Sequence, residues 1–278
     1  MVSLPSMRLA VVLGGVCLLA QQPQSPSPMV EHTRAHPRLR QETPAGDRQA
    51  LELGALFLPS KLRLKSPAPL LVFFHGGTWL PEVAAARSGK TAVISIQIGA
   101  GSGVYAKAFG DPKRFPDLLA EAEAKAGLRF ELVTLAGWSA GCGAIREILK
   151  SPQAYARVRR VLAIDGIHTG YLGGKPDPEN LQIYLKLGRD AMQGAKQFII
   201  THSEIFPGTY ASTTETADYL LDQLGLRRRP VLRWGPMGTQ QLSEVRRGGF
   251  LVIGYAGNSA PDHVDQLHSL PEYLRWLR

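Results

Sequence analysis

The sequence predicts a single α/β domain, in which a mostly parallel central sheet is covered by helices on both faces. The chain has 278 residues, 44% of them hydrophobic, which suits one sizeable buried core. Short continuous apolar runs recur along the chain, as expected for strands that are buried on both faces. Amphipathic stretches alternate with these runs, and this alternation is typical of a parallel sheet flanked by helices.

The apolar runs are interpreted as strands and the amphipathic stretches as helices. The expected strands are 51–58, 70–74, 91–98, 132–137, 158–164, 197–201 and 250–254. The expected helices are 115–126, 141–149, 181–193, 213–224 and 263–277. Pro112 and Pro116 mark the start of the first of these helices.

The N-terminus has the pattern of a secretory signal. Arg8 supplies a positive charge, and the apolar run from Leu9 to Ala20 is too short to span a bilayer. We therefore expect residues 1–20 to be a signal peptide and the protein to be secreted or periplasmic, touching a membrane only if this segment is not cleaved. An N-terminal anchor, or a true start at Met7, is the alternative.

The segment after the signal differs in composition from the rest of the chain. Residues 21–48 are rich in Pro, Gln, Ser and Arg and lack apolar periodicity, which predicts a disordered, solvated leader. The folded domain is then expected to span 49–278. Only Cys142 remains after the signal, so this domain is expected to fold without an internal disulfide.

The strongest chemical motif is a Gly-x-Ser-x-Gly pentapeptide at residues 137–141, between an expected strand and an expected helix. A serine hydroxyl is a weak nucleophile, so an enzyme must present Ser139 on a turn where a histidine can take its proton. Gly137 and Gly141 permit the close backbone approach that such a turn requires. The N–H of Ala140, at the positive end of the following helix, is expected to donate to an oxyanion.

With this motif in its context, the chain resembles the α/β-hydrolase superfamily from about residue 50 to the C-terminus. The resemblance implies an α/β-hydrolase fold, the chain order Ser, acid, His, and chemistry on esters, thioesters or amides. No cofactor is implied.

A second motif precedes the nucleophile. The apolar strand 70–74 ends in His75-Gly76-Gly77, which resembles the oxyanion loop of the same superfamily. Glycines let backbone N–H groups point at developing negative charge. We expect Gly77 or Thr78 to be a donor and His75 to orient the loop rather than to act as the base.

The catalytic base is expected after the last strand. The segment that follows strand 250–254 carries His263, at the same sheet edge as Ser139. His268 is the rival, but its place inside an expected helix favours a packing role.

The acid partner of the histidine has two candidates. The superfamily pattern implies an aspartate after the penultimate strand, 197–201, and it is missing there. Asp165, at the end of the preceding strand, is favoured because a buried carboxylate needs a partner. Glu204 is the alternative acid.

Three aromatic side chains flank these motifs. We expect Trp79, Trp138 and Tyr171 to wall the substrate pocket, although core packing accounts equally well for both tryptophans. The segment 169–180 is too short for a large cap domain, so the cleft should be open or lightly lidded. No paired histidine spacing supports a metal site, and none is expected.

The net charge is +9 with a pI near 9.7. The Lys and Arg residues are scattered, so the charge indicates solubility rather than a nucleic-acid site, with acidic substrates or cell-envelope polymers as the alternative. We expect a secreted carboxylic ester hydrolase acting on a small or polymeric acyl substrate. An amidase or peptidase of envelope material, or an inactive binding protein of the same fold, is the alternative. The oligomeric state is not predicted.

Overall fold

The computed structural model describes residues 37–62 and 67–277. The predicted signal peptide therefore lies outside the described residues. Among these, a ten-stranded sheet has the order β1-β2-β4-β3-β5-β6-β9-β12-β11-β10. Its strands are β1 (Gly46–Ala50), β2 (Ala55–Pro59), β3 (Ala68–Phe74), β4 (Ala92–Ile96), β5 (Phe130–Trp138), β6 (Val158–Ile164), β9 (Gln197–His202), β10 (Arg229–Trp234), β11 (Gln240–Arg247) and β12 (Phe250–Tyr255).

The helices fall between the strands. They are α2 (Trp79–Ser88), α3 (Ser102–Phe109), α4 (Arg114–Ala126), α5 (Cys142–Lys150), α6 (Pro152–Arg157), α7 (Gln182–Met192), α8 (Thr213–Gln223), α9 (Ala260–His268) and α10 (Leu270–Trp276). The single-turn 3-10 helices are η1 (Ser139–Gly141), η2 (Glu179–Leu181) and η3 (Pro236–Gly238).

The centre of the sheet, from β4 to β12, is parallel. β1, β2, β11 and β10 pair antiparallel at its edges. All the parallel strands had been predicted, because strands buried on both faces are continuously apolar. β1, β10 and β11 had not, because strands at or next to the edge of the sheet carry polar and charged residues that face water, as in Arg229–Trp234.

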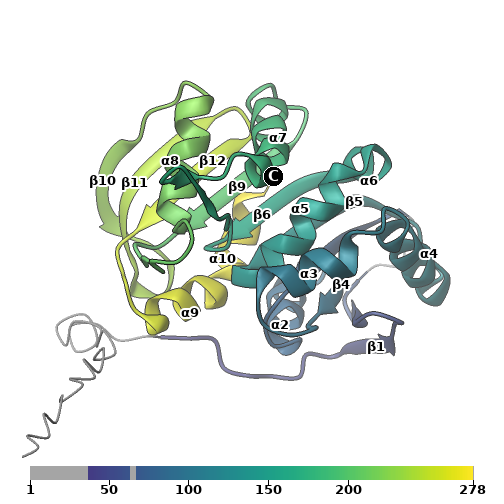
Figure 1. Cartoon of the computed structure of the whole chain (residues 1–278). Helices are drawn as coiled ribbons and strands as arrows, with labels where there is room; N and C mark the ends of the chain where they lie inside the picture. Colours follow the sequence, from purple (N-terminus) through teal and green to yellow (C-terminus); the bar gives the residue numbers. More distant parts are fainter. Residues whose placement is uncertain (1–36, 63–66, 278) are drawn as a thin grey trace, which may run out of the picture.

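Two apolar layers sandwich the sheet. Along β3, Leu70, Val72 and Phe74 point into the core beneath α3 to α8, whereas Leu71 and Phe73 point into the core beneath α2, α9 and α10. This alternation follows from the period of two in a strand. In Figure 1, α3, α5 and α6 lie in front of the sheet and α10 behind it.

The expected mostly parallel central sheet with helices on both faces is confirmed. Between β6 and α7 the described chain holds only η2 and a small hairpin, β7 (Tyr171–Leu172) and β8 (Lys175–Pro176), and no large cap domain.

The ends of the domain differ from the prediction in two places. Arg38 Nε donates to Asp265 at 2.9 Å and the Leu39 N–H to His268 Nδ1 at 3.1 Å, so ordered contacts begin before residue 49. The expected helix 263–277 is divided into α9 and α10, because Pro271 has no N–H to continue the first helix and instead sits at the start of the second.

Candidate active site

The nucleophile motif forms a sharp strand-to-helix turn, as predicted. β5 ends at Trp138, Ser139 follows at a φ of 49°, and α5 begins three residues later. A left-handed φ is strained for a serine and persists only where the surrounding structure enforces it. The turn thus holds Ser139 at the end of a rigid central strand.

Two glycines make the turn possible, for the reason anticipated from the sequence. A Cβ on Gly141 would lie 2.2 Å from the Phe74 carbonyl oxygen, and one on Gly137 would lie 2.9 Å from the Gly141 carbonyl carbon. The elbow is therefore packed directly against the end of β3, and no side chain can be inserted there without moving backbone.

The structure brings the expected base and the favoured acid together. His263 Nδ1 lies 2.7 Å from Asp165 Oδ2, across 98 residues of sequence. Asp165 follows β6, and His263 stands in the first turn of α9, which begins three residues before the expected helix 263–277. A Ser259–Asp262 capping box starts this helix and fixes the position of His263.

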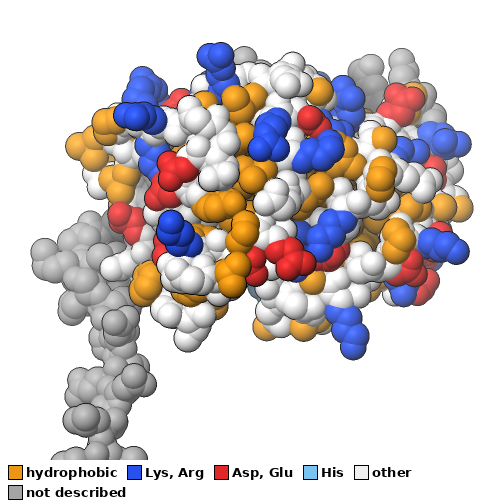
Figure 2. All heavy atoms as spheres, turned by 45° about the horizontal axis from the view of Figure 1, so that its top comes forward, with side chains coloured by type: hydrophobic (Ala, Val, Ile, Leu, Met, Phe, Trp, Pro, Cys, Tyr) orange, Lys and Arg blue, Asp and Glu red, His pale blue; other side chains and the backbone are white. Residues whose placement is uncertain are grey.

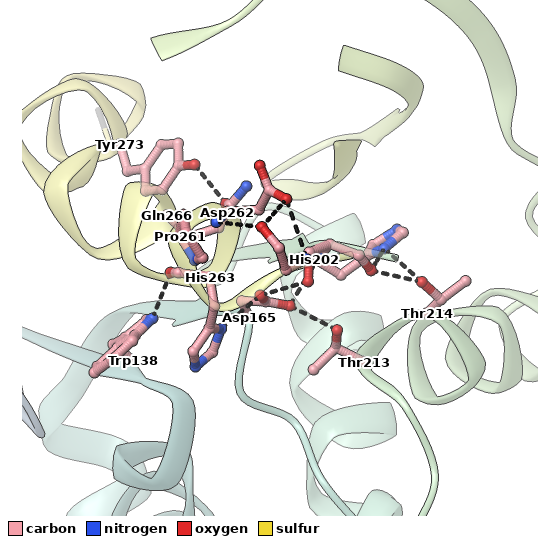
Figure 3. A network of polar contacts seen from close by, with 12 residues as sticks. Trp138, Asp165, His202, Thr213, Thr214, Pro261, Asp262, His263, Gln266 and Tyr273 are labelled. Carbon is pink, nitrogen blue, oxygen red and sulfur yellow. Dashed lines mark hydrogen bonds and ion pairs between the residues drawn. The ribbon is translucent and has the colours of Figure 1, made fainter. Parts of the chain in front are cut away.

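The carboxylate of Asp165 is 1% exposed and fully hydrogen-bonded (Figure 3). It also accepts from the Ser203 N–H at 2.9 Å, the Ser203 hydroxyl at 2.7 Å and the Thr213 hydroxyl at 2.6 Å. Burial acts to raise the pKa of Asp165, but His263 and these donors outweigh burial and hold the pKa below its usual value. Asp165 is therefore an anion at neutral pH.

The two alternatives weighed for these roles lie elsewhere. Glu204 is exposed and lies outside the cavities at Ser139. His268 is buried and accepts the hydrogen bond from Leu39, which is a packing role.

Two cavities meet at Ser139. The smaller, of about 140 Å³, is lined by Ser139, Asp165 and His263 among others, and the larger has about 570 Å³. Ser139, His168 and Tyr210 line both. The Ser139 hydroxyl makes no hydrogen bond in the described part of the chain, and such contacts commonly tighten only when substrate binds.

Trp138 contacts His263 from one side and His75 from the other. Its ring stacks on His75 at 5.1 Å and lies 4.5 Å from the imidazole of His263, and its Nε1 donates to the His263 carbonyl at 3.0 Å. It supports the base from the side and is not among the residues that line either cavity.

Trp79 and Tyr171 are not pocket residues, contrary to the prediction. Trp79 begins α2 and lies against His268, with ring centroids 5.8 Å apart. The Tyr171 hydroxyl donates to Glu215 at 2.9 Å, because the 171–176 hairpin turns it toward α8. The aromatic residue that lines both cavities is Tyr210.

The predicted oxyanion donors are only partly supported. Ala140 lines the larger cavity with Ser139, but neither Gly77 nor Thr78 lines a cavity at Ser139. The chain turns into α2 directly after the motif, so Thr78 is the N-cap and the Gly77 carbonyl accepts from the Leu80 N–H at 3.0 Å.

Two polar residues of the larger cavity were missed. Arg146, on α5, had been treated only as part of a helix; its place seven residues after the nucleophile was the available signal. His168 belongs to none of the motifs in the sequence. Its Nδ1 is buried without a hydrogen-bond partner among the described residues, and burial lowers its pKa to about 4.

The described residues hold no group of three or more His, Cys, Asp or Glu side chains placed to bind a metal ion. Over the same ranges, no helix combines the length and apolar character needed to cross a membrane.

Several solved structures resemble the chain at low identity, whereas no protein-family model and no curated protein matches it. LpqC, a poly(3-hydroxybutyrate) depolymerase from Bordetella parapertussis, is 17% identical over 78% of this chain and 80% of its own, with a TM-score of 0.45. The esterase Est2 from Thermogutta terrifontis is 14% identical over 83% and 92%, with a TM-score of 0.47. TT1662 from Thermus thermophilus is 19% identical over 84% and 99%, with a TM-score of 0.46.

Proposed function

We propose that this chain is a serine hydrolase that cleaves carboxylic esters through an acyl-enzyme on Ser139. The observation that carries the proposal is the 2.7 Å hydrogen bond between His263 Nδ1 and the buried Asp165, beside a cavity that Ser139 also lines. The proposed nucleophile follows β5, the proposed acid follows β6, and the proposed base stands in the first turn of α9, which follows β12.

The hydrogen bond sets the direction of proton transfer. An ionised Asp165 can only accept, so His263 keeps its proton on Nδ1 and leaves Nε2 free as an acceptor. Nε2 takes the Ser139 proton while Oγ attacks the ester carbonyl carbon. Asp165 then stabilises the imidazolium that results.

The rest of the cycle needs only these groups and water. The carbonyl π electrons move to oxygen, and the Ala140 N–H stabilises the oxyanion. When the tetrahedral intermediate collapses, the imidazolium returns the proton to the leaving alcohol and the acyl group stays on Ser139. Water, activated by His263, then attacks the acyl-enzyme and releases the acid.

Labelling with a fluorophosphonate probe tests the nucleophile. We expect one covalent adduct on Ser139 in the wild-type protein, none in Ser139→Ala, and normal labelling in Ser88→Ala, which replaces an exposed serine on α2. Labelling of Ser139→Ala equal to wild type would refute the assignment. A panel of esters and amides with matched acyl groups then decides between an esterase and the alternative, an amidase or peptidase.

We also propose that the enzyme works outside the cytoplasm, on the signal-like pattern of residues 1–20. N-terminal sequencing of the protein from its native cells should find a start after Ala20. An N-terminus at residue 1 on cell-retained protein would contradict export by cleavage.

A further inference from the structure

The larger cavity at Ser139 is electrostatically one-sided. Arg146 lines it, and none of the described residues lining it is an aspartate or glutamate. A cavity that offers a guanidinium without a carboxylate favours a ligand of negative charge.

The position of Arg146 suits contact with a bound substrate. It stands on α5, which begins three residues after Ser139, and side chains on a helix lean toward its N-terminal end. Its side chain is only 14% exposed. Arg146 lies four residues, or about 6 Å along the helix axis, beyond the first residue of α5, which leaves room for a spacer between an ester carbonyl and a charged group.

The hydrogen-bonding capacity of Arg146 is largely unused. Its Nε donates to Glu147 at 2.8 Å, and its two Nη groups make no hydrogen bond to the described residues. Glu147 also accepts from Lys150 at 2.8 Å, so one carboxylate is shared by two cations and a positive charge remains. The planar fork of a guanidinium matches the two oxygens of a carboxylate.

The neighbouring groups are compatible with an anion. α3 begins at the cavity, with Ser102 and Gly103 lining it and no acidic residue in its first turn. His168 offers a hydrogen bond without adding charge, because its pKa of about 4 keeps the ring neutral at pH 7.

The positive charge of the protein surface also favours an anionic substrate. The chain has a net charge of +9, and Lys and Arg side chains are spread over the face shown in Figure 2. Such a surface raises the rate at which anionic molecules arrive, most of all at low salt.

We infer that the substrate is an ester bearing a second, anionic group, a carboxylate, which Arg146 binds while Ser139 attacks the ester carbonyl. This inference rests on the proposed ester hydrolysis and adds the class of substrate. An ester without the charge would be turned over, but with lower kcat/KM.

Two matched pairs of esters test the inference. In the first, the carboxylate is on the acyl side: 4-nitrophenyl hydrogen adipate is compared with its methyl ester by release of nitrophenolate. In the second, the carboxylate is on the leaving group: 4-acetoxyphenylacetate is compared with its methyl ester. We expect the anionic member of at least one pair to have about tenfold higher kcat/KM.

Two variants of equal charge change separate Arg146 from general charge effects. In Arg146→Gln the ratio of anionic to neutral kcat/KM should fall about tenfold. In Lys150→Gln, which removes the other partner of Glu147 from an exposed position, the ratio should stay within about twofold, since that side chain does not line the cavity.

The outcomes distinguish this inference from the function on which it rests. A wild-type ratio of one or less in both pairs, or a ratio unchanged by Arg146→Gln, would overturn the anionic substrate while ester hydrolysis stands. Absence of turnover for all four esters, together with absence of fluorophosphonate labelling, would overturn the proposed function itself.

Discussion

The indole Nε1 of Trp138 donates a 3.0 Å hydrogen bond to the main-chain oxygen of His263. The residue before the proposed nucleophile thus holds the backbone of the proposed base. The centroids of the two rings also lie 4.5 Å apart, so the end of β5 contacts the first turn of α9. This contact lies next to Ser139, from which His263 is proposed to take a proton.

Replacing Trp138 by Phe should remove this hydrogen bond while keeping an aromatic ring. A neutral hydrogen bond contributes about 1 kcal/mol, so we expect the free energy of unfolding to fall by about 1 kcal/mol and kcat/KM, which depends on the position of His263, to fall about fivefold. Trp79→Phe is the matched control and should stay within about twofold, because Trp79 lies against His268 outside the cavities. Equal losses in both variants would argue against a role for the indole N–H.

Replacing Asp165 by Asn should nearly abolish turnover. The amide cannot stabilise the imidazolium and permits the wrong tautomer of His263, so kcat/KM should fall about 10⁴-fold. Glu204→Gln should leave kcat/KM within about twofold, because Glu204 is exposed and away from the cavity. A larger loss in Glu204→Gln than in Asp165→Asn would reverse the assignment of the acid.

Protonation of His202 should destabilise the fold in mild acid. Its Nε2 accepts from Arg228 at 2.7 Å, and burial followed by that guanidinium lowers its pKa to about 4. Between pH 6.5 and about 4 the unfolded chain therefore binds a proton that the folded chain does not. The free energy of unfolding should therefore decrease as the pH is lowered through this window, by about 1.4 kcal/mol per pH unit for this residue.

Urea unfolding at several pH values between 7 and 4 measures this slope. His202→Gln should have a shallower slope over the same window, because the titrating ring is gone while a donor and an acceptor remain. An unchanged slope would show that His202 is already protonated in the native protein near pH 6.5, and would contradict the role of Arg228 as its donor.

Replacing Gly141 by Ala should damage the elbow through packing alone. The new Cβ would lie 2.2 Å from the Phe74 oxygen, so backbone must shift, and the free energy of unfolding should fall by about 3 kcal/mol or more. In Gly170→Ala the new Cβ would meet no atom within 4 Å, so the free energy of unfolding should change by less than about 0.5 kcal/mol. Similar denaturant midpoints for the two variants would contradict the close packing of β3 on the turn.

The sequence predicted the centre of the fold well, and the reason is burial. Central parallel strands such as Ala68–Phe74 are apolar at every position, so they can be recognised directly. By contrast, the strand Gln240–Arg247, next to the edge of the sheet, has only two apolar residues, Leu242 and Val245, and resembles a loop in sequence. Its place in the sheet depends on pairing with β12, which local sequence does not reveal.

The candidate site was predictable where a motif fixes geometry. Gly-x-Ser-x-Gly requires a turn at Ser139, and a buried aspartate after β6 requires a partner, which the structure supplies as His263. The His-Gly-Gly motif misled the choice of Gly77 and Thr78, because nothing in it shows that α2 starts at once. Tyr210 belongs to no motif and reaches the cavities only through tertiary packing.

The rate of acylation of Ser139 tests the central claim most directly. A rapid-quench experiment with 4-nitrophenyl acetate, followed by mass analysis of the peptide that contains residue 139, measures this rate. We expect the acyl group on Ser139 in the wild-type protein and a rate lower by about 10³-fold or more in His263→Ala. Acylation of another residue, or an equal rate on Ser139 without the imidazole, would contradict the account.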